Sequence, residues 1–244
     1  MNNVITLLFL MLACTTAIAD GKNISYEING EAYEGYYTSP IANAPLVLLI
    51  HDWDGLTDYE VQRAEMLSDL GYAVFAADLF GAGVRPTEVK DKRQHTGALY
   101  KDREKMQSLL SGALETAQLN GANINNAIAI GYCFGGAAVL ELARAGAELK
   151  GFVTFHGGLN TPTGQDYSKT KGNLLIFHGT ADQAITMDDF AKLGRELEEA
   201  GVSHEMISYG GAPHAFTVFG SDRYREDADK QSWLRFTQFL DETL

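Results

Sequence analysis

Residues 128–138 read Ile-Ala-Ile-Gly-Tyr-Cys-Phe-Gly-Gly-Ala-Ala. An apolar run typical of a buried strand leads into a glycine-rich turn, and an alanine-rich helical stretch follows it. Gly131 and Gly135 flank Cys133 and let the backbones of strand and helix approach closely. Cys133 then lies beside a helix N-terminus, whose partial positive charge favours a thiolate. The stretch predicts a strand-to-helix junction that presents a reactive cysteine; the alternative is a turn that binds nothing.

Strand-like and helix-like segments alternate on both sides of this junction. Alternation of this kind predicts an α/β fold, with a mostly parallel sheet sandwiched between helices. Residues 81–97 form the longest irregular stretch, which we expect to flank the site. The predicted strands are 32–38, 46–50, 72–77, 127–130, 151–155, 174–177 and 205–209, and the predicted helices are 57–70, 102–119, 137–145, 187–200 and 227–240.

Two further polar residues follow predicted strands. Asp182 comes after the strand at 174–177, and His214 comes after the strand at 205–209. Nucleophile, acid and base occur in this chain order in α/β-hydrolases, and parallel sheets place their sites at the carboxyl ends of strands. Cys133, Asp182 and His214 are therefore the predicted nucleophile, orienting acid and base. Taken singly, Asp182 is equally well a turn residue and His214 a loop residue. His156 is a candidate for the pocket wall.

The size and charge of the chain exclude several classes of function. The 244 residues, 45% of them hydrophobic, are enough for one domain with a large core. A net charge of −13 repels phosphate backbones, so we expect no nucleic-acid partner. No metal-ligand spacing and no glycine-rich nucleotide motif is present in the sequence, so we expect neither a metal nor a cofactor.

The first residues differ in kind from the rest. Residues 1–19 carry no charged side chain, and an apolar run is followed by Ala17-Ile18-Ala19 before Asp20. This pattern is typical of a secretory signal peptide, and the run is too short for a comfortable membrane span. We predict cleavage after Ala19, a single domain over 20–244, a periplasmic or secreted location and no stable membrane insertion. Lipidation at Cys14 and an uncleaved apolar end are the alternatives.

Two backbone N–H groups are candidates for stabilising an oxyanion. The first belongs to Phe134, the residue after the nucleophile. In this fold the loop after the first parallel strand supplies the second donor, and here that loop begins His51-Asp52-Trp53, so the candidate is Trp53. Packing of the Trp53 indole against the loop is an equally good explanation for a tryptophan there.

The chain resembles the dienelactone hydrolase family of α/β-hydrolases over about residues 30–240. The resemblance implies a Cys133–His214–Asp182 triad, and it implies that the acid after His51, here Asp52 where the family usually has Glu, modulates the resting thiol. Family members also hold a substrate carboxylate with two arginines, but the matched positions here are Ala82 and Val218. Phe216 and the nearby Arg85 and Arg223 are the candidate substrate-binding residues; for the two arginines, ordinary surface charge is the alternative. The matching segments are His51–Trp53 with Gly55 and Leu56, Tyr72–Val74 with Asp78–Phe80, Gly131–Gly136, His178–Asp182 and His214–Phe216.

The sequence thus predicts a monomeric hydrolase of a small carboxylic ester or lactone, acting through an acyl-cysteine intermediate on Cys133. One rival is a non-catalytic thiol-binding or redox-sensing protein on a hydrolase scaffold, because signal cleavage would leave Cys133 as the only cysteine. A second rival is a cysteine peptidase or amidase. An intact Asp182 and His214 argue against the first rival.

Overall fold

A computed structural model describes residues 21–244 of the chain, and the predicted signal peptide lies outside them. Its eight strands form one sheet in the order β1-β2-β4-β3-β5-β6-β7-β8. The pairs from β4 to β8 are parallel, whereas β1 and β2 are antiparallel additions at one edge. The strands are β1 Lys22–Ile28, β2 Glu31–Thr38, β3 Pro45–Ile50, β4 Ala73–Ala77, β5 Asn123–Tyr132, β6 Gly151–Phe155, β7 Asn173–Gly179 and β8 His204–Tyr209.

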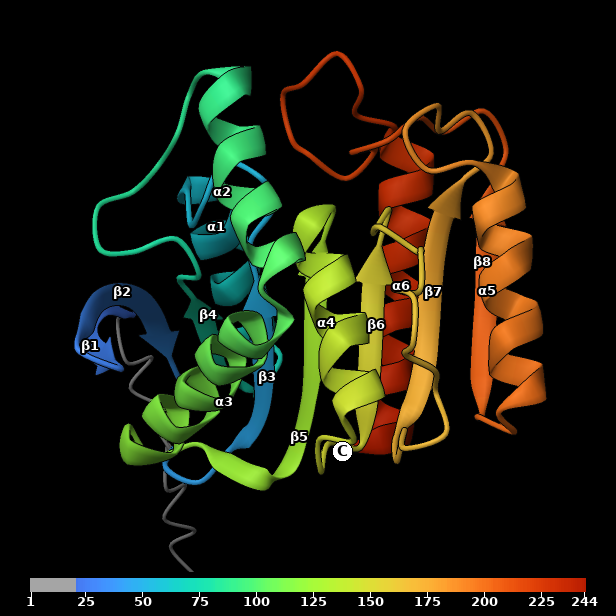
Figure 1. The fold of residues 1–244 in the computed structure, drawn as a ribbon. Helices are drawn as coiled ribbons and strands as arrows, with labels where there is room; N and C mark the ends of the chain where they lie inside the picture. The colour runs from blue at the N-terminus through green and yellow to red at the C-terminus, as the bar shows by residue number, and fades with distance from the viewer. Residues whose placement is uncertain (1–20) are drawn as a thin grey trace, which may run out of the picture.

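Helices cover both faces of this sheet (Figure 1). Helices α3, α4 and α5 lie on the face toward the viewer, and α1 and α6 lie behind it. This confirms the predicted mostly parallel sheet between helices. The helices are α1 Asp58–Ser68, α2 Val89–Lys101, α3 Arg103–Leu119, α4 Phe134–Ala145, α5 Met187–Glu199 and α6 Glu226–Thr243.

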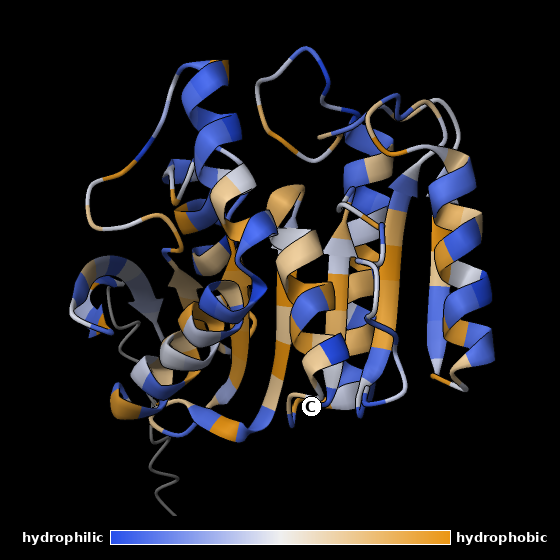
Figure 2. Cartoon of the chain, in the orientation of Figure 1, coloured by the Kyte–Doolittle hydropathy of each residue, from blue (hydrophilic) through white to orange (hydrophobic). Residues whose placement is uncertain are grey.

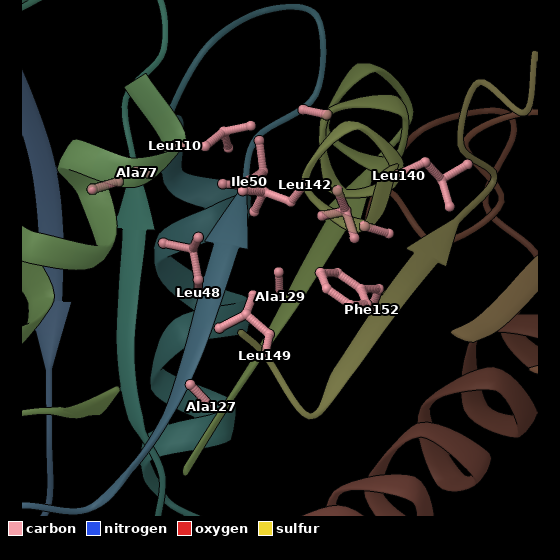
Figure 3. Packing of buried hydrophobic residues seen from close by; sticks show 14 of the residues in the cluster. Leu48, Ile50, Ala77, Leu110, Ala127, Ala129, Leu140, Leu142, Leu149 and Phe152 are labelled. Atoms are coloured by element: carbon pink, nitrogen blue, oxygen red, sulfur yellow. The ribbon is translucent and has the colours of Figure 1, made fainter. Parts of the chain in front are cut away.

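Each central strand is apolar on both faces because both faces are covered. In β3, Leu48 and Ile50 pack into the core under α3 and α4, and Val47 and Leu49 pack into the core under α1 and α6. Figure 3 shows Leu48 and Ile50 with helix residues such as Leu110. The hydropathy colours of Figure 2 place the apolar residues on the strands and on the inner sides of the helices. Among the described residues, no helix is long and apolar enough to cross a membrane.

Two segments differ from the sequence-based expectation. Helix α2 starts at Val89, so the predicted irregular stretch 81–97 was wrong in its second half. Thr96 and Leu99 are the buried residues that α2 contributes, which leaves no clear apolar periodicity in its sequence. Strand β1 was also not predicted; it pairs with β2 through a two-residue turn at Asn29-Gly30, both with positive φ.

Candidate active site

Cys133 stands at the junction of β5 and α4 in a strained backbone conformation. Its φ of 52° and ψ of −112° are rarely adopted by a residue with a side chain. The junction is tight because a β-carbon on Gly131 would lie 2.2 Å from the carbonyl carbon of Gly135. A β-carbon on Gly135 would lie 2.3 Å from the carbonyl oxygen of Ile50. The glycines of the quoted stretch are thus required by close backbone contact, and the contact fixes where Cys133 points.

Three side chains from separate loops meet at this junction in a line of hydrogen bonds. The Nε2 atom of His214 lies 3.1 Å from Sγ of Cys133, and its Nδ1 atom lies 2.8 Å from Oδ2 of Asp182. The other oxygen of Asp182 accepts hydrogen bonds from the backbone N–H groups of Ala184 and Ile185, at 2.8 and 2.9 Å. The structure therefore brings together the nucleophile, base and acid that the sequence predicted, and the turn after β7 fixes the acid.

The surroundings favour a charged His214 and a charged Asp182. Burial alone would lower the pKa of His214, but its hydrogen bonds to Asp182 and Cys133 outweigh burial and raise that pKa to about 10. Burial alone would raise the pKa of Asp182, but the hydrogen bond from His214 and those from the Ile185 and Ala184 N–H groups hold the pKa below its usual range. Both pKa shifts favour an imidazolium at His214 that is hydrogen-bonded to a carboxylate at Asp182.

Asp52 lines the same pocket as Cys133, but its carboxyl is occupied within its own loop. Oδ1 of Asp52 accepts a hydrogen bond of 2.9 Å from the N–H of Asp54. Burial, the hydrogen bond with the Asp54 carboxylate and the nearby Glu60 together raise the pKa of Asp52 to about 10. Lys92 balances the Asp54 carboxylate at 3.2 Å. Asp52 is therefore a neutral carboxylic acid near pH 7.

The two expected oxyanion donors both lie at the pocket. Phe134 is the first residue of α4, so its N–H has no partner within the helix. Trp53 lines the pocket from the loop after β3, and Lys92 lies 5.2 Å from the centre of its ring. This cation–π contact gives the indole a packing role. The backbone N–H of Trp53, and not its indole, therefore stays the candidate donor to an oxyanion.

The pocket in front of Cys133 has a volume of about 320 Å³ and a mostly apolar wall. Two arginines are part of its lining: Arg93 from α2 and Arg223 from the loop before α6. Arg223 was predicted from the sequence, whereas Arg93 was missed because α2 was not predicted. The lining residues are Asp52, Trp53, Arg93, Tyr100, Cys133, Phe134, Gly158, Ala184, Ile185, His214, Ala215 and Arg223.

Two predicted substrate-binding residues are not in the pocket. The guanidinium of Arg85 lies 3.6 Å from the carboxylate of Asp78 and donates to the carbonyl of Val84. It is therefore engaged outside the pocket lining. Phe216 is fully buried in the core under α6, where its ring packs on Tyr209 and His156. Neither residue lines the pocket, because proximity in sequence to a motif does not fix the direction of a side chain. His156 is also fully buried and does not line the pocket.

The remaining histidines that follow strands are structural. His51 accepts a hydrogen bond from the N–H of Leu79 through Nε2, at 3.1 Å, and its Nδ1 lies 2.6 Å from the carbonyl of Asp52. His178 stacks on the ring of Phe190. Among residues 21–244, no group of histidine, cysteine and acidic side chains could hold a metal ion.

Comparison with known proteins shows the family of the chain. The model of the dienelactone hydrolase family matches residues 33–244. A Salmonella typhimurium protein provisionally named carboxymethylenebutenolidase is 24% identical over 224 residues, covering 86% of this chain and 83% of that protein. A Bradyrhizobium protein provisionally named 2-oxo-3-(5-oxofuran-2-ylidene)propanoate lactonase is 24% identical over 218 residues, covering 84% and 87%.

Solved structures give the same assignment. The structure "m3DLH" superimposes with a TM-score of 0.86 at 30% identity, covering 92% of this chain and 98% of that one. A dienelactone hydrolase-like promiscuous phosphotriesterase from metagenomic libraries gives 0.85 at 28% identity, covering 91% and 98%. The chain belongs to the dienelactone hydrolase family, and with it to the α/β-hydrolases.

Proposed function

We propose that this hydrolase cleaves a carboxylic ester or lactone through an acyl-cysteine intermediate on Cys133. The observation that carries the proposal is the hydrogen-bonded line from Cys133 through His214 to Asp182, placed at a strained junction that opens into a pocket. Membership of the dienelactone hydrolase family supports the ester or lactone substrate.

In the first half of the reaction, Sγ of Cys133 attacks the carbonyl carbon as a thiolate while His214 holds the thiol proton. The carbonyl π electrons move to oxygen, and the N–H groups of Phe134 and Trp53 are the proposed donors to that oxyanion. When the oxyanion collapses, the carbon–oxygen ester bond breaks. His214 gives its proton to the leaving alcohol oxygen. In a lactone that alcohol stays joined to the acyl group.

In the second half, water replaces the leaving group. His214 takes a proton from the water, whose oxygen attacks the thioester carbon. The same oxyanion donors stabilise the second tetrahedral intermediate, and its collapse breaks the carbon–sulfur bond. Cys133 leaves as a thiolate beside the protonated His214, and the carboxylic acid product loses its proton to solvent. The products are a carboxylate and an alcohol, or one hydroxy acid from a lactone. Asp182 keeps the imidazole in one orientation and stabilises its positive charge through both halves.

The role proposed for Asp52 is to set the charge beside the thiol. A carboxylate at that position would oppose a thiolate on Cys133, whereas the neutral acid does not. The proposed role of Asp52 does not require a hydrogen bond from its carboxyl group to the sulfur of Cys133. Oδ1 of Asp52 instead accepts a hydrogen bond from the backbone N–H of Asp54.

The test of the whole proposal uses Cys133→Ala and His214→Asn against a set of aryl esters, lactones and thioesters. We expect the wild type to turn over at least one class and each variant to lose roughly 1,000-fold or more in kcat. A mass increase equal to the acyl group, located on Cys133 after a rapid acid quench, would show the intermediate. Cys133→Ala with unchanged turnover contradicts the proposal, and oxidation of Cys133 without any turnover would favour the redox-sensing alternative.

We further propose that the substrate carries an acidic group held at Arg93 and Arg223, which both line an otherwise mainly apolar pocket. Arg223→Gln and Arg93→Gln should raise KM for an aryl ester with a terminal carboxylate about tenfold, and leave the matched neutral ester within about twofold. Arg85→Gln is the matched control, because Arg85 lies outside the pocket lining. Equal effects on both esters would remove the anion site and leave the hydrolase proposal standing.

Export also remains a proposal. Residues 1–19 carry the pattern of a secretory signal, so we expect a mature chain that starts at Asp20 and is periplasmic or secreted. N-terminal sequencing of the protein from a periplasmic or culture-medium fraction tests this. A lipid-modified N-terminus at Cys14, or an intact Met1 in the cytoplasmic fraction, would contradict it.

A further inference from the structure

The turn that carries His214 is strained and depends on its surroundings. Ala215, the next residue, has a φ of 62°, a conformation that costs free energy for a residue other than glycine. Phe216 and Thr217 follow, and both are fully buried. A strained turn persists only where the neighbouring structure fixes it, so the contacts of the buried residues decide where the imidazole of His214 lies.

Thr217 makes three polar contacts with parts of the chain far away in sequence. Its Oγ1 atom lies 2.7 Å from the hydroxyl of Tyr59 and 2.8 Å from Nε2 of His156. Its carbonyl oxygen accepts a hydrogen bond of 2.9 Å from Nη2 of Arg63. One residue thereby joins the His214 turn to α1 and to the end of β6.

The hydrogen bonds of this network connect Arg63 with His156. Arg63 is buried and paired with Asp229, and its Nε–H donates to the hydroxyl of Tyr59 at 3.3 Å. The hydroxyl groups of Tyr59 and Thr217 continue the network to Nε2 of His156, and either partner of each of these two hydrogen bonds can be the donor. Burial, with repulsion from His214, holds the pKa of His156 well below its usual range, so its imidazole is neutral.

The network ends against the imidazole of His214. The rings of His156 and His214 pack edge to face, with centroids 5.4 Å apart. Asp182 and Cys133 hold the two nitrogens of His214, and His156 supports its ring. A neutral His156 adds no positive charge beside an imidazolium. The turn and the ring of His214 are thus both fixed through Thr217.

We propose that Thr217 is a positioning residue for His214, and that Arg63, Tyr59 and His156 act through its hydroxyl and carbonyl groups. The proposal rests on the proposed role of His214 as base. Without the hydroxyl, the turn loses its side-chain anchors to α1 and β6 and the imidazole shifts from the line between Asp182 and Cys133. A displacement of the order of 1 Å at a catalytic group costs on the order of 100-fold in rate.

The test is Thr217→Val, which keeps the shape of the side chain and removes the hydroxyl. We expect kcat on the best aryl ester to fall roughly 10- to 100-fold while KM changes by less than about threefold. The rate of Cys133 alkylation by iodoacetamide, followed against pH, should shift in its midpoint, because thiolate formation depends on His214. Thr217→Ser should restore kcat and the alkylation profile to within about threefold of wild type.

A matched control separates positioning from stability. Thr38 is also buried and lies in β2, and its hydroxyl donates to the hydroxyl of Ser68, so Thr38→Val removes a buried threonine hydroxyl away from the site. Thr38→Val should lower the melting temperature without moving kcat or the alkylation profile. If Thr217→Val fails to fold, Tyr59→Phe removes another hydroxyl of the same hydrogen-bond network. It should shift the alkylation profile in the same direction as Thr217→Val.

Two results would overturn the proposal. One is a folded Thr217→Val protein with wild-type kcat and alkylation profile; the other is a Thr217→Ser protein as impaired as Thr217→Val. The alkylation measurement needs no ester turnover. A wild type that turns over no ester, yet shows a pH profile of Cys133 alkylation that shifts in Thr217→Val and is restored in Thr217→Ser, would refute the hydrolase reaction and leave the positioning role intact.

Discussion

The carboxyl group of Asp52 is buried in a cluster of acids. Its pKa is raised to about 10 by burial and by Asp54 and Glu60, whereas an unfolded aspartate has a pKa of 3.8. The folded state therefore binds more protons than the unfolded state between these values, and the free energy of unfolding falls as pH rises through that window. Below the unfolded pKa this effect vanishes, because both states are protonated.

Asn in place of Asp52 copies the neutral acid without its titration. Asp52→Asn should raise the free energy of unfolding near pH 8 by about 1–3 kcal/mol and leave it unchanged near pH 3.5. Urea unfolding of wild type and variant at the two pH values measures this. Asp241→Asn is the control, because the Asp241 carboxylate is exposed on α6 and accepts a hydrogen bond from the hydroxyl of Tyr72. A gain that is equal at both pH values would mean that Asp52 is not held neutral.

Individual residues show how much of the site can be predicted from the sequence. The positions of Cys133, Asp182 and His214, each after the end of a parallel strand, were enough to predict that they meet, since parallel strands end at one edge. Arg85 and Phe216 were misplaced because their directions depend on Asp78 and on the core under α6, which no local pattern encodes. The network behind His214 was not foreseen at all, because it joins residues from four separate parts of the chain.

At the scale of elements, the contact between α4 and the end of β3 is so close that a side chain on Gly135 is excluded. A β-carbon on Gly135 would lie 2.3 Å from the Ile50 oxygen and 2.5 Å from the His51 oxygen, both backbone atoms of β3 and its loop. Gly97 lies in α2 with nothing within 4 Å of the corresponding position and no positive φ. The two glycines are both helical, and only one is required by packing.

The same substitution should thus have opposite effects at the two positions. Gly135→Ala should lower the free energy of unfolding by about 3 kcal/mol or more, because backbone atoms cannot move aside. Gly97→Ala should raise it by roughly 0.5–1 kcal/mol, since alanine is the better helix former. Chemical denaturation of both variants measures the difference. A Gly135→Ala protein as stable as the wild type would contradict the close contact between α4 and the end of β3.

Elements with a clear apolar period were predicted, and those without it were missed. The central strands and α1, α3, α4, α5 and α6 follow the expected segments within a few residues, apart from ends such as that of β5. Helix α2 escaped because it packs only two buried residues against the fold. Since α2 supplies Arg93 and Tyr100, the missed element is also the missed wall of the pocket. Strand β1 is an edge strand with mostly exposed residues, so its pattern is weak.

For the whole molecule, buried acids of two kinds set the response of stability to pH. Burial and the approach of Asp54 raise the pKa of Glu60 to about 7 despite its helix-capping hydrogen bonds, so Glu60, like Asp52, costs stability as pH rises from about 4.5. His214, with a pKa raised to about 10, contributes stability that is lost as pH rises through that value.

Other acids act in the opposite direction at low pH. Burial alone would raise the pKa of Glu141, but hydrogen bonds from Arg144, Gln107 and Gln165 hold the pKa below its usual range. Asp182 is likewise held below its usual range. Such groups contribute stability that is present above their unfolded pKa and is lost as pH falls below it. The two kinds of acid confine the maximum of stability to weakly acidic pH.

We therefore expect the melting temperature to peak at about pH 5 and to fall by roughly 4–8 °C by about pH 9. The net charge of −13 adds to this fall, because ionised surface acids repel one another in the compact folded state. Salt separates the two contributions: roughly 0.5 M NaCl near pH 9 should recover the part due to surface repulsion, and should leave the part due to buried Asp52 and Glu60. Thermal unfolding followed by circular dichroism across pH at two salt concentrations measures both.

In Asp52→Asn the fall in melting temperature above pH 5 should be smaller at either salt concentration. A melting temperature that rises from pH 5 to pH 8 would contradict the raised pKa values of Asp52 and Glu60 together.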